Sequence, residues 1–401
     1  MISHPSALSS AHKRKDHMSE YQYYEFLAID RPLTLEEMAS LRTISTRATI
    51  TPVSFINHYN FGDFKGNPDK LMERFFDAHV YVANWMEAIF KVRIPSEALS
   101  KETVEVMADS DAIYFKATKT HWIITWHLEE SENHERFEEE DGRVWMARLS
   151  PIRDELLRGD LRSLYIGWIA TVNREMADDD EMEPICVSGL GNLTSAQKAL
   201  ADFLEVDKDL LAGAGIGNKA SQDTKVSHQE MDAWIDVLPG DEVKALLKQL
   251  LNGQGQQAER SLKNRFAGWR RGLRGDDSKS PRRSIGELLA NAEAAEKIRL
   301  EKQKQEKKRQ EAKRQKEREA YLKNLSKDFP KVWKSVQQTI ERGSGLAYDQ
   351  ACRELVDLSE AYALNTGKKN FQKELKAFME DHLKRKSLIQ RLVKAGIWNE
   401  K

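Results

Sequence analysis

The chain has 401 residues, of which 40% are hydrophobic and 32% charged, with two cysteines. This length allows two or three domains of about 100–200 residues, and the charged share is above the usual value of about 25%, so part of the charge is expected in solvated segments. No run of about 18 apolar residues exists, so no membrane span is predicted. The polar residues 1–17 lack the apolar stretch of a secretory signal. Cys186 and Cys352 provide neither a disulfide framework nor a cysteine-based metal site, and we expect a cytoplasmic protein.

The net charge of −1 conceals an acidic part and a basic part. Counting Lys and Arg against Asp and Glu, residues 1–259 carry 27 − 44 = −17, residues 260–323 carry 21 − 10 = +11, and residues 324–401 carry 15 − 10 = +5. This asymmetry indicates either a polyanionic partner for the basic part or docking of one part onto the other. A charged helix that is merely solvated is the plainer alternative.

Residues 20–175 show strand and helix signals in alternation, after a tail (residues 1–19) that we expect to be disordered. Strands are predicted where aromatic and β-branched residues gather, and helices where apolar residues recur every three to four positions. The predicted strands are 21–29, 48–61, 88–94, 112–118 and 121–128, and helices are predicted after the capping box of Thr34 and Glu37 and over 69–85. This order predicts an α+β fold with an N-terminal mixed α/β sandwich, for which a ferredoxin-like arrangement is one candidate.

Beyond residue 175 the signals become helical. Residues 185–275 are expected to form a helical region, and residues 284–325 one long charged single helix. Residues 326–401 are expected to form a bundle of short amphipathic helices joined by brief turns. Two further capping boxes are present, at Thr194 with Gln197 and at Ser227 with Glu230. The predicted architecture is therefore completed by all-helical regions joined by a long charged helix.

The long helix has almost no apolar residue from Glu301 to Glu319, so the a/d seam of a coiled coil is missing. Opposite charges recur at helical spacing instead, and each pair would contribute about 0.2–0.5 kcal/mol, less in the Lys-first orientation. The expected pairs are Lys302 with Glu306, Lys307 with Glu311 and Lys313 with Glu317. At about 1.5 Å per residue, residues 287–323 would form a rod of roughly 55 Å between two folded parts.

Three other patterns resemble functional sites but have simpler explanations. Residues 213–217 are rich in glycine like a phosphate-binding loop, yet they follow a helix and lack the Lys-Ser/Thr ending, so a flexible linker is expected. His121, His127 and His134 cluster among glutamates, but the first two would lie about 20 Å apart along a strand. Acidic runs such as 178–180 are typical of solvated loops. The sequence therefore predicts no catalytic, cofactor-binding or metal-binding residue.

The strongest functional signal is the segment 260–283, which interleaves basic residues with Phe266 and Trp269. Arginines contact phosphates and aromatic rings stack on bases, so this segment is a candidate nucleic-acid surface. The candidate contact residues are Arg260, Lys263, Arg265, Arg270, Arg271, Arg274, Lys279, Arg282 and Arg283. In the alternative, a stripe at helical spacing from Leu262 to Leu273 faces a core, and the arginines merely occupy the outer face.

The chain resembles a family of bacterial proteins with no assigned activity, which share a YQYYEFxAIDRPLT-type N-terminal motif. The likeness lies in residues 21–52 and in the Gly-Asp-Phe-Lys-Gly of residues 62–66. It continues through GLGNLTSAQKALADFL (189–204), the charged helix and the tail, and so covers nearly the whole chain. Genes of this family often lie near those of SWIM-type zinc-finger proteins and Swi/Snf-type helicases, which implies an association with DNA-related complexes. The resemblance implies no catalytic residue.

These observations predict a non-catalytic accessory or scaffolding subunit of a bacterial complex. Its C-terminal helices would bind protein partners, its basic segment would contact DNA, RNA or another polyanion, and a helicase-containing complex is one candidate assembly. The alternative is an enzyme whose site in the α/β domain is built from scattered residues. The candidates for that site are Tyr24, His58, Asp63, Lys65 and Arg153. A deep pocket lined by several of them would favour the enzyme, whereas a purely structural spacer would bind no polyanion.

Overall fold

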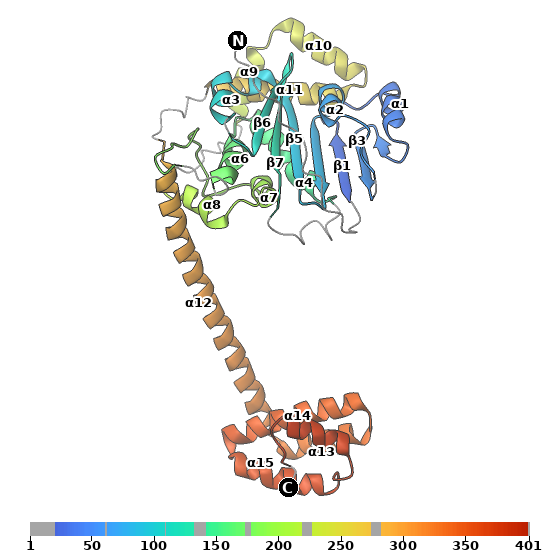
Figure 1. The fold of residues 1–401 in the computed structure, drawn as a ribbon, viewed down its shortest axis with the longest axis vertical. Helices are drawn as coiled ribbons and strands as arrows, with labels where there is room; N and C mark the ends of the chain where they lie inside the picture. The colour runs from blue at the N-terminus through green and yellow to red at the C-terminus, as the bar shows by residue number, and fades with distance from the viewer. Residues whose placement is uncertain are drawn as a thin grey trace, which may run out of the picture. The chain divides into compact units, whose positions relative to one another are not determined.

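Seven antiparallel strands form a sheet in the N-terminal part of the protein (Figure 1). The computed structural model describes residues 21–60, 62–108, 110–131, 142–172, 178–218, 227–273 and 282–399. The strands are β1 (Gln22–Leu27), β2 (Thr49–Thr51), β3 (Ser54–Tyr59), β4 (Ala78–Ala83), β5 (Ala88–Pro95), β6 (Ile113–Ala117) and β7 (His121–Leu128). Their order across the sheet is β2-β3-β1-β4-β5-β7-β6.

Helices make up most of the remaining described structure, and the predicted α+β class is confirmed. Those of the first 300 residues are α1 (Leu35–Ile44), α2 (Pro68–Arg74), the 3-10 helix η1 (Ser96–Ala98), α3 (Lys101–Met107), α4 (Trp145–Leu149), α5 (Pro151–Leu157), α6 (Arg162–Val172), α7 (Ser195–Phe203), α8 (Lys208–Gly215), α9 (His228–Asp236), α10 (Gly240–Leu251), α11 (Gly255–Leu273) and the start of α12 (Ile285–Leu325). The others are α13 (Phe329–Glu341), α14 (Gly345–Asn365), α15 (Lys368–Glu380) and α16 (Lys386–Lys394). None of the described helices is long and apolar enough to cross a membrane.

The helix starts follow the local sequence signals. All three predicted capping boxes are formed, with the N-cap side chain accepting from the N3 backbone and the N3 side chain from the N-cap backbone. They are Thr34 with Glu37, Thr194 with Gln197, and Ser227 with Glu230. Each box satisfies two backbone N–H groups that would otherwise lack a partner, so these starts are determined locally.

The predicted helix over residues 69–85 is wrong beyond its first turns. Helix α2 ends at Arg74, and residues 78–83 form strand β4, in which every residue is buried. A strand buried on both faces carries apolar residues without the two-residue alternation of a half-exposed strand. Its sequence therefore resembles the buried face of a helix.

The predicted single strand over residues 48–61 is also wrong, because the chain reverses within it. Strands β2 and β3 form an antiparallel hairpin that turns at Pro52 and Val53.

The ferredoxin-like arrangement, predicted as one candidate, describes the first four strands. The chain runs β1-α1-β2-β3-α2-β4, and these strands lie side by side in the order β2-β3-β1-β4, so each βαβ unit is split by a strand between its two strands. Neighbouring strands are antiparallel, as this arrangement requires, and α1 and α2 pack on the same face of the sheet. Strands β5, β7 and β6 extend the sheet beyond β4.

The sheet carries a hydrophobic core on each face. One core joins Phe26, Phe55 and Tyr81 to residues of α1 and α2, and the other joins Phe90 and Trp126 to helices α4 to α8 and to the start of α12. The change in composition between residues 175 and 185 is therefore a change along the sequence and not a border between two cores. Helices α7 and α8, which follow it, share a hydrophobic core with the strands that precede it.

The chain divides into two compact units, residues 1–297 and residues 298–401, and α12 runs from the first into the second. In the second unit, α14 contacts α13, α15 and α16. Its core contains Val336, Leu355, Leu358, Phe371 and Leu392, all at most 2% exposed. The amphipathic patterns of this region therefore become the buried sides of packed helices.

The first turns of α12 pack against the end of α8. A Cβ atom on Gly213 would lie 2.5 Å from the backbone nitrogen of Ala292, so this approach requires glycine. The backbone N–H of Ile285 also donates to the carbonyl oxygen of Glu181 at 2.8 Å. The flexible linker predicted for residues 213–217 is therefore wrong for its first three residues, which belong to α8 and hold α12 in place.

Replacing Gly213 should loosen this attachment. We expect Gly213→Ala to lower the stability of the full chain by about 1–2 kcal/mol, because the overpacking penalty exceeds the gain in helix propensity. Thermal and urea unfolding would measure the change. Gly240→Ala is the matched control, because that glycine also lies in a helix but a Cβ atom there meets nothing within 4 Å. Equal stability of the two variants would contradict the close packing.

His79 of β4 is a buried, uncharged imidazole. It is 1% exposed, and its ring stacks on Phe26 with ring centroids 3.9 Å apart. Its Nδ1 lies 3.0 Å from the carbonyl oxygen of Glu25, so Nδ1–H is the donor. Burial lowers the pKa of His79 from 6.5 to about 3. The folded protein therefore keeps this ring neutral at pH values where an unfolded chain would protonate it.

Stability should consequently fall as the pH drops from about 6.5 to about 3, because only the unfolded chain binds this proton in that window. We expect His79→Phe, which keeps a stacked ring, to reduce the slope of stability against pH by up to one proton, about 1.4 kcal/mol per pH unit. Urea unfolding at a series of pH values would measure it. An unchanged slope in His79→Phe would refute the assignment.

Candidate nucleic-acid interface

Helix α11 carries the first part of the predicted nucleic-acid segment and packs against α9 through aromatic rings. Phe266 contacts Trp234 of α9 and Trp269 of α11, with ring centroids 5.2 Å and 5.9 Å away. Ala267 is buried next to them, whereas Leu273 at the end of the predicted stripe is 63% exposed. Phe266 and Trp269 are half-buried. The stripe is therefore partly covered by α9, and its end at Leu273 does not face the core that the alternative interpretation predicted.

Four of the nine predicted contact residues lie on α11 and pair with carboxylates. The pairs are Arg260 with Asp154 at 3.2 Å, Lys263 with Glu259 at 2.5 Å, Arg270 with Glu230 at 3.2 Å, and Arg265 with Glu242. Arg270 is only 11% exposed, whereas Lys263 is 65% exposed and its pair is a weak surface contact. A phosphate group would have to displace these carboxylates, so the pairs reduce the positive charge that α11 offers to a polyanion.

Arg283, just before α12, pairs with Glu183 and donates to the end of α8, a set of contacts that we call the clasp. It is therefore not a surface cation. Its Nη2 lies 3.0 Å from Oε2 of Glu183, which is 4% exposed. Its Nη1 donates to the carbonyl oxygen of Ala214 at 2.8 Å, at the end of α8. Burial alone would lower the pKa of Arg283, but the hydrogen bonds to Glu183 outweigh burial and raise this pKa above its usual value. Arg283 thus stays charged and links α8, residue 183 and α12.

Of the four remaining predicted residues, the structure describes the side chain of one, Arg282. Arg271 lies on α11 but its side chain is outside the described part, as are Arg274 and Lys279. Arg282 is exposed, and it has no ion pair among the described residues. Among the predicted residues whose side chains are described, Lys263 and Arg282 are thus the cations most accessible to a partner.

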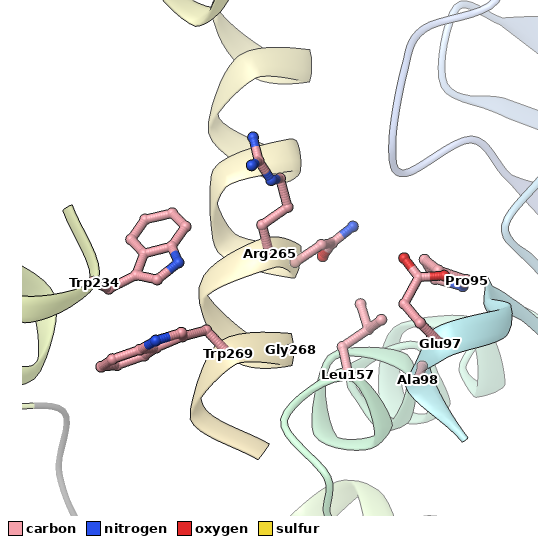
Figure 2. A pocket seen from close by; sticks show the side chains of 9 residues that line it. Pro95, Glu97, Ala98, Leu157, Trp234, Arg265, Gly268 and Trp269 are labelled. Atoms are coloured by element: carbon pink, nitrogen blue, oxygen red, sulfur yellow. The ribbon is translucent and has the colours of Figure 1, made fainter. Parts of the chain in front are cut away.

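A small cavity of about 270 Å³ lies beside α11 (Figure 2). Trp234 and Trp269 lie on one side of it, and Glu97 and Leu157 on the other, with Arg265 on the helix between them. Its volume is below the roughly 300–1,000 Å³ typical of pockets that hold small molecules. The cavity also contains none of the five side chains named for an enzyme site.

Those five side chains are not brought together by the fold. Tyr24 and His58 lie on opposite faces of the sheet, because Tyr24 pairs with Asn57 and the next residue of each strand points the other way. Tyr24 is 8% exposed, and its hydroxyl donates to Gln22. Asp63 accepts from the same glutamine at 3.2 Å. Lys65 lies in the loop between β3 and α2.

Arg153 has a structural position at one end of the sheet. Its side chain is fully buried, Nε donates to the carbonyl oxygen of Arg93 at 2.7 Å, and Nη2 lies 2.6 Å from Oδ2 of Asp30. Asp77 accepts from Arg93 at 2.7 Å in the same cluster. Burial alone would raise the pKa of Asp77, but the charges of Arg153 and Arg93 outweigh it and lower the pKa. The cluster joins helix α5 to the ends of three strands.

The cations of α12 were absent from the predicted contact residues, because they were expected to pair with glutamates at helical spacing. Of the three expected pairs, Lys313 with Glu317 is formed at 3.9 Å. Glu306 instead accepts a hydrogen bond from Gln310 at 3.3 Å. The Lys-first orientation is the weaker one, and the glutamines one turn further on compete for the carboxylates. In the sequence, a glutamine four residues after a glutamate, as at Gln305 and Gln310, is the signal that would have indicated unpaired lysines.

Removal of the guanidinium at the clasp should destabilise the protein strongly. We expect Arg283→Met to cost about 3 kcal/mol, because it leaves the carboxylate of Glu183 buried and unpaired. Arg282→Met removes the same charge at the neighbouring exposed position and should change stability by less than about 0.5 kcal/mol. Urea unfolding of both variants would measure the difference. The clasp would be disproved if the two variants were equally stable.

The chain was compared with protein-family models, curated proteins and solved structures, and none of them matches it. The resemblance to the bacterial family with the YQYYEFxAIDRPLT-type motif therefore stays a prediction. No relative supplies a ligand, partner or catalytic role that could be carried over to these residues.

Proposed function

We propose that this protein is a non-catalytic accessory or scaffolding subunit, with a basic segment that contacts nucleic acid or another polyanion. The observation that carries the proposal is the way α12 is held. It is fixed by buried contacts near each of its ends, one in each unit, while residues 302–316 between them are exposed. A helix built in this way joins two folded bodies and leaves its own surface available.

At its first end, α12 is held by the clasp of Arg283 and Glu183 and by its close approach to Gly213. At its other end, Arg318 pairs with Asp357 of α14 at 2.6 Å, and Leu322 is 4% exposed. These contacts lie within the first and the second unit, respectively. They support the scaffolding role, because each end of the helix has its own attachment.

The protein partners of this proposal would meet the second unit. Its helices bury one another's apolar sides, yet Leu346, Leu364 and Leu383 remain 82%, 58% and 58% exposed. Contact with nucleic acid is supported by the excess of cations, 21 − 10 = +11 over residues 260–323. The ion pairs of α11 neutralise part of that positive charge. In this proposal, segment 260–283 therefore contacts the polyanion through exposed cations such as Lys263 and Arg282.

An enzymatic role has less support among the described residues. The discriminating observation would have been a deep pocket shared by several of the named side chains. Tyr24 and Arg153 are instead buried in packing and ion-pair networks.

The proposal predicts salt-dependent binding of nucleic acid by the full chain. We expect labelled single-stranded and duplex DNA and RNA to bind at low salt, with log K falling linearly against log salt because bound counterions are released. Fluorescence anisotropy across a salt series would measure the slope. A variant with Lys263, Arg274, Lys279 and Arg282 all replaced by glutamine should show a smaller slope if segment 260–283 contacts phosphates.

Two outcomes would count against the proposal. If no nucleic acid binds even at low salt, contact with nucleic acid is ruled out. If binding is unaffected by salt, the contact is not with phosphates. Arg270 and Arg283 are left unchanged in this experiment, because loss of their ion pairs would confuse unfolding with lost binding.

A further inference from the structure

The middle of α12 is the most cationic and most exposed stretch of the described protein. Residues 302–316 contain eight Lys or Arg and two Glu, 8 − 2 = +6. Every one of these fifteen residues is exposed. Ala312 is the one apolar residue among them. This stretch therefore has no packing role within its own unit that would explain its composition.

Most of these cations lack a carboxylate partner in the described structure. Glu306 accepts from Gln310, and Glu301, just before the stretch, accepts from Gln305 at 3.1 Å. Lys313 is paired with Glu317, but only at 3.9 Å and with both side chains more than half exposed. The arginines of α11, by contrast, pair with Asp154, Glu230 and Glu242 on other elements. Positive charge is thus neutralised on α11 and left available on α12.

Half of these cations follow one side of the helix. Lys302, Arg309, Lys313 and Lys316 are separated by seven, four and three residues, spacings that return to the same side. We call these four residues the α12 stripe. At about 1.5 Å per residue it extends over roughly 21 Å. The other four cations, Lys304, Lys307, Lys308 and Arg314, lie on the opposite side of the same stretch.

We infer that the α12 stripe binds the phosphate backbone of nucleic acid. The inference rests on the proposed function and deepens it, because it moves the main contact from segment 260–283 to α12 and names the partner. Duplex DNA carries about one charge per 1.7 Å, so roughly 21 Å of duplex offers about twelve phosphates to four cations. The helix is held at both ends before binding, which lowers the ordering cost that a flexible basic tail would bear.

The composition favours nucleic acid over an acidic protein surface. Protein interfaces are enriched in aromatic residues, Met and Arg and depleted in Lys. Residues 302–316 contain six lysines and no aromatic residue. Lysines act as point charges that satisfy phosphates without sequence preference. The stripe should therefore bind DNA and RNA with a strong dependence on salt and little dependence on sequence.

Three variants of the full chain, each lacking four positive charges, test this inference. The first replaces the α12 stripe by glutamine, the second replaces the four cations on the opposite side, and the third is the segment 260–283 variant described above. Glutamine is a good helix former, so the exposed helix should persist, and circular dichroism would verify this. Anisotropy with labelled duplex and single-stranded DNA across a salt series would give affinity and slope for each variant.

For the stripe variant we expect at least a tenfold loss of affinity and a salt slope on duplex DNA smaller by about 3–4. The opposite-side variant should lose less than half of that slope. Equal losses of affinity in these two variants, or a loss confined to the segment 260–283 variant, would refute binding by the α12 stripe. Either result would leave the proposed function standing. Absence of all nucleic-acid binding in the unaltered chain would remove both. Displacement of DNA by polyglutamate at equal or lower charge concentration would assign the stripe to an acidic polypeptide instead.

Discussion

The structure depends on one constraint, which is that the middle of α12 has no apolar side to bury. A helix that is polar all round gains nothing from packing, so its position has to be set at its ends. The first end is set by Gly213, which lets two helix backbones approach closely, and by the buried pair of Arg283 and Glu183. The second end is set by Arg318, Tyr321 and the apolar residues beside them. Each attachment belongs to a different unit, which makes the charged stretch part of a defined structure.

Basic residues of two kinds look alike in the sequence, those of α11 and those of α12, and the fold distinguishes them by whether a carboxylate lies opposite. The arginines of α11 lie where α11 packs against the acidic N-terminal part, and carboxylates on α5, α9 and α10 meet them. The lysines of residues 302–316 meet no carboxylate from another element among the described residues of their own unit, and glutamines take up two of the nearest carboxylates. An ion pair between elements needs a partner at the right place in the fold. A count of charges along the chain therefore overestimates the unpaired positive charge of α11 and underestimates that of α12.

Buried charge serves the fold elsewhere in the first unit. Arg153 and Asp77 join α5 to the strand ends, and their charges are paired because an unpaired buried charge would cost several kcal/mol. Polar residues in a sheet domain can suggest an active site when only the sequence is known. In this protein, the side chains that suggested one are spread over both faces of the sheet and over its end. Tyr24 and Arg153 are buried in packing and ion pairs, whereas His58, Asp63 and Lys65 are exposed.

The sequence by itself determined the features that depend on neighbours along the chain. These include the three capping boxes, the strands β6 and β7, the long helix over residues 285–325, the amphipathic helices after it and the α+β class. Only the tertiary structure decided the identity of β4, since a strand buried on both faces has no two-residue alternation to reveal it. It also decided the strand order, the role of Gly213 and the partners of the arginines, because each depends on residues distant in sequence. The nine predicted contact residues were chosen by type and spacing, and neither property records which carboxylate will lie opposite a guanidinium once the chain has folded.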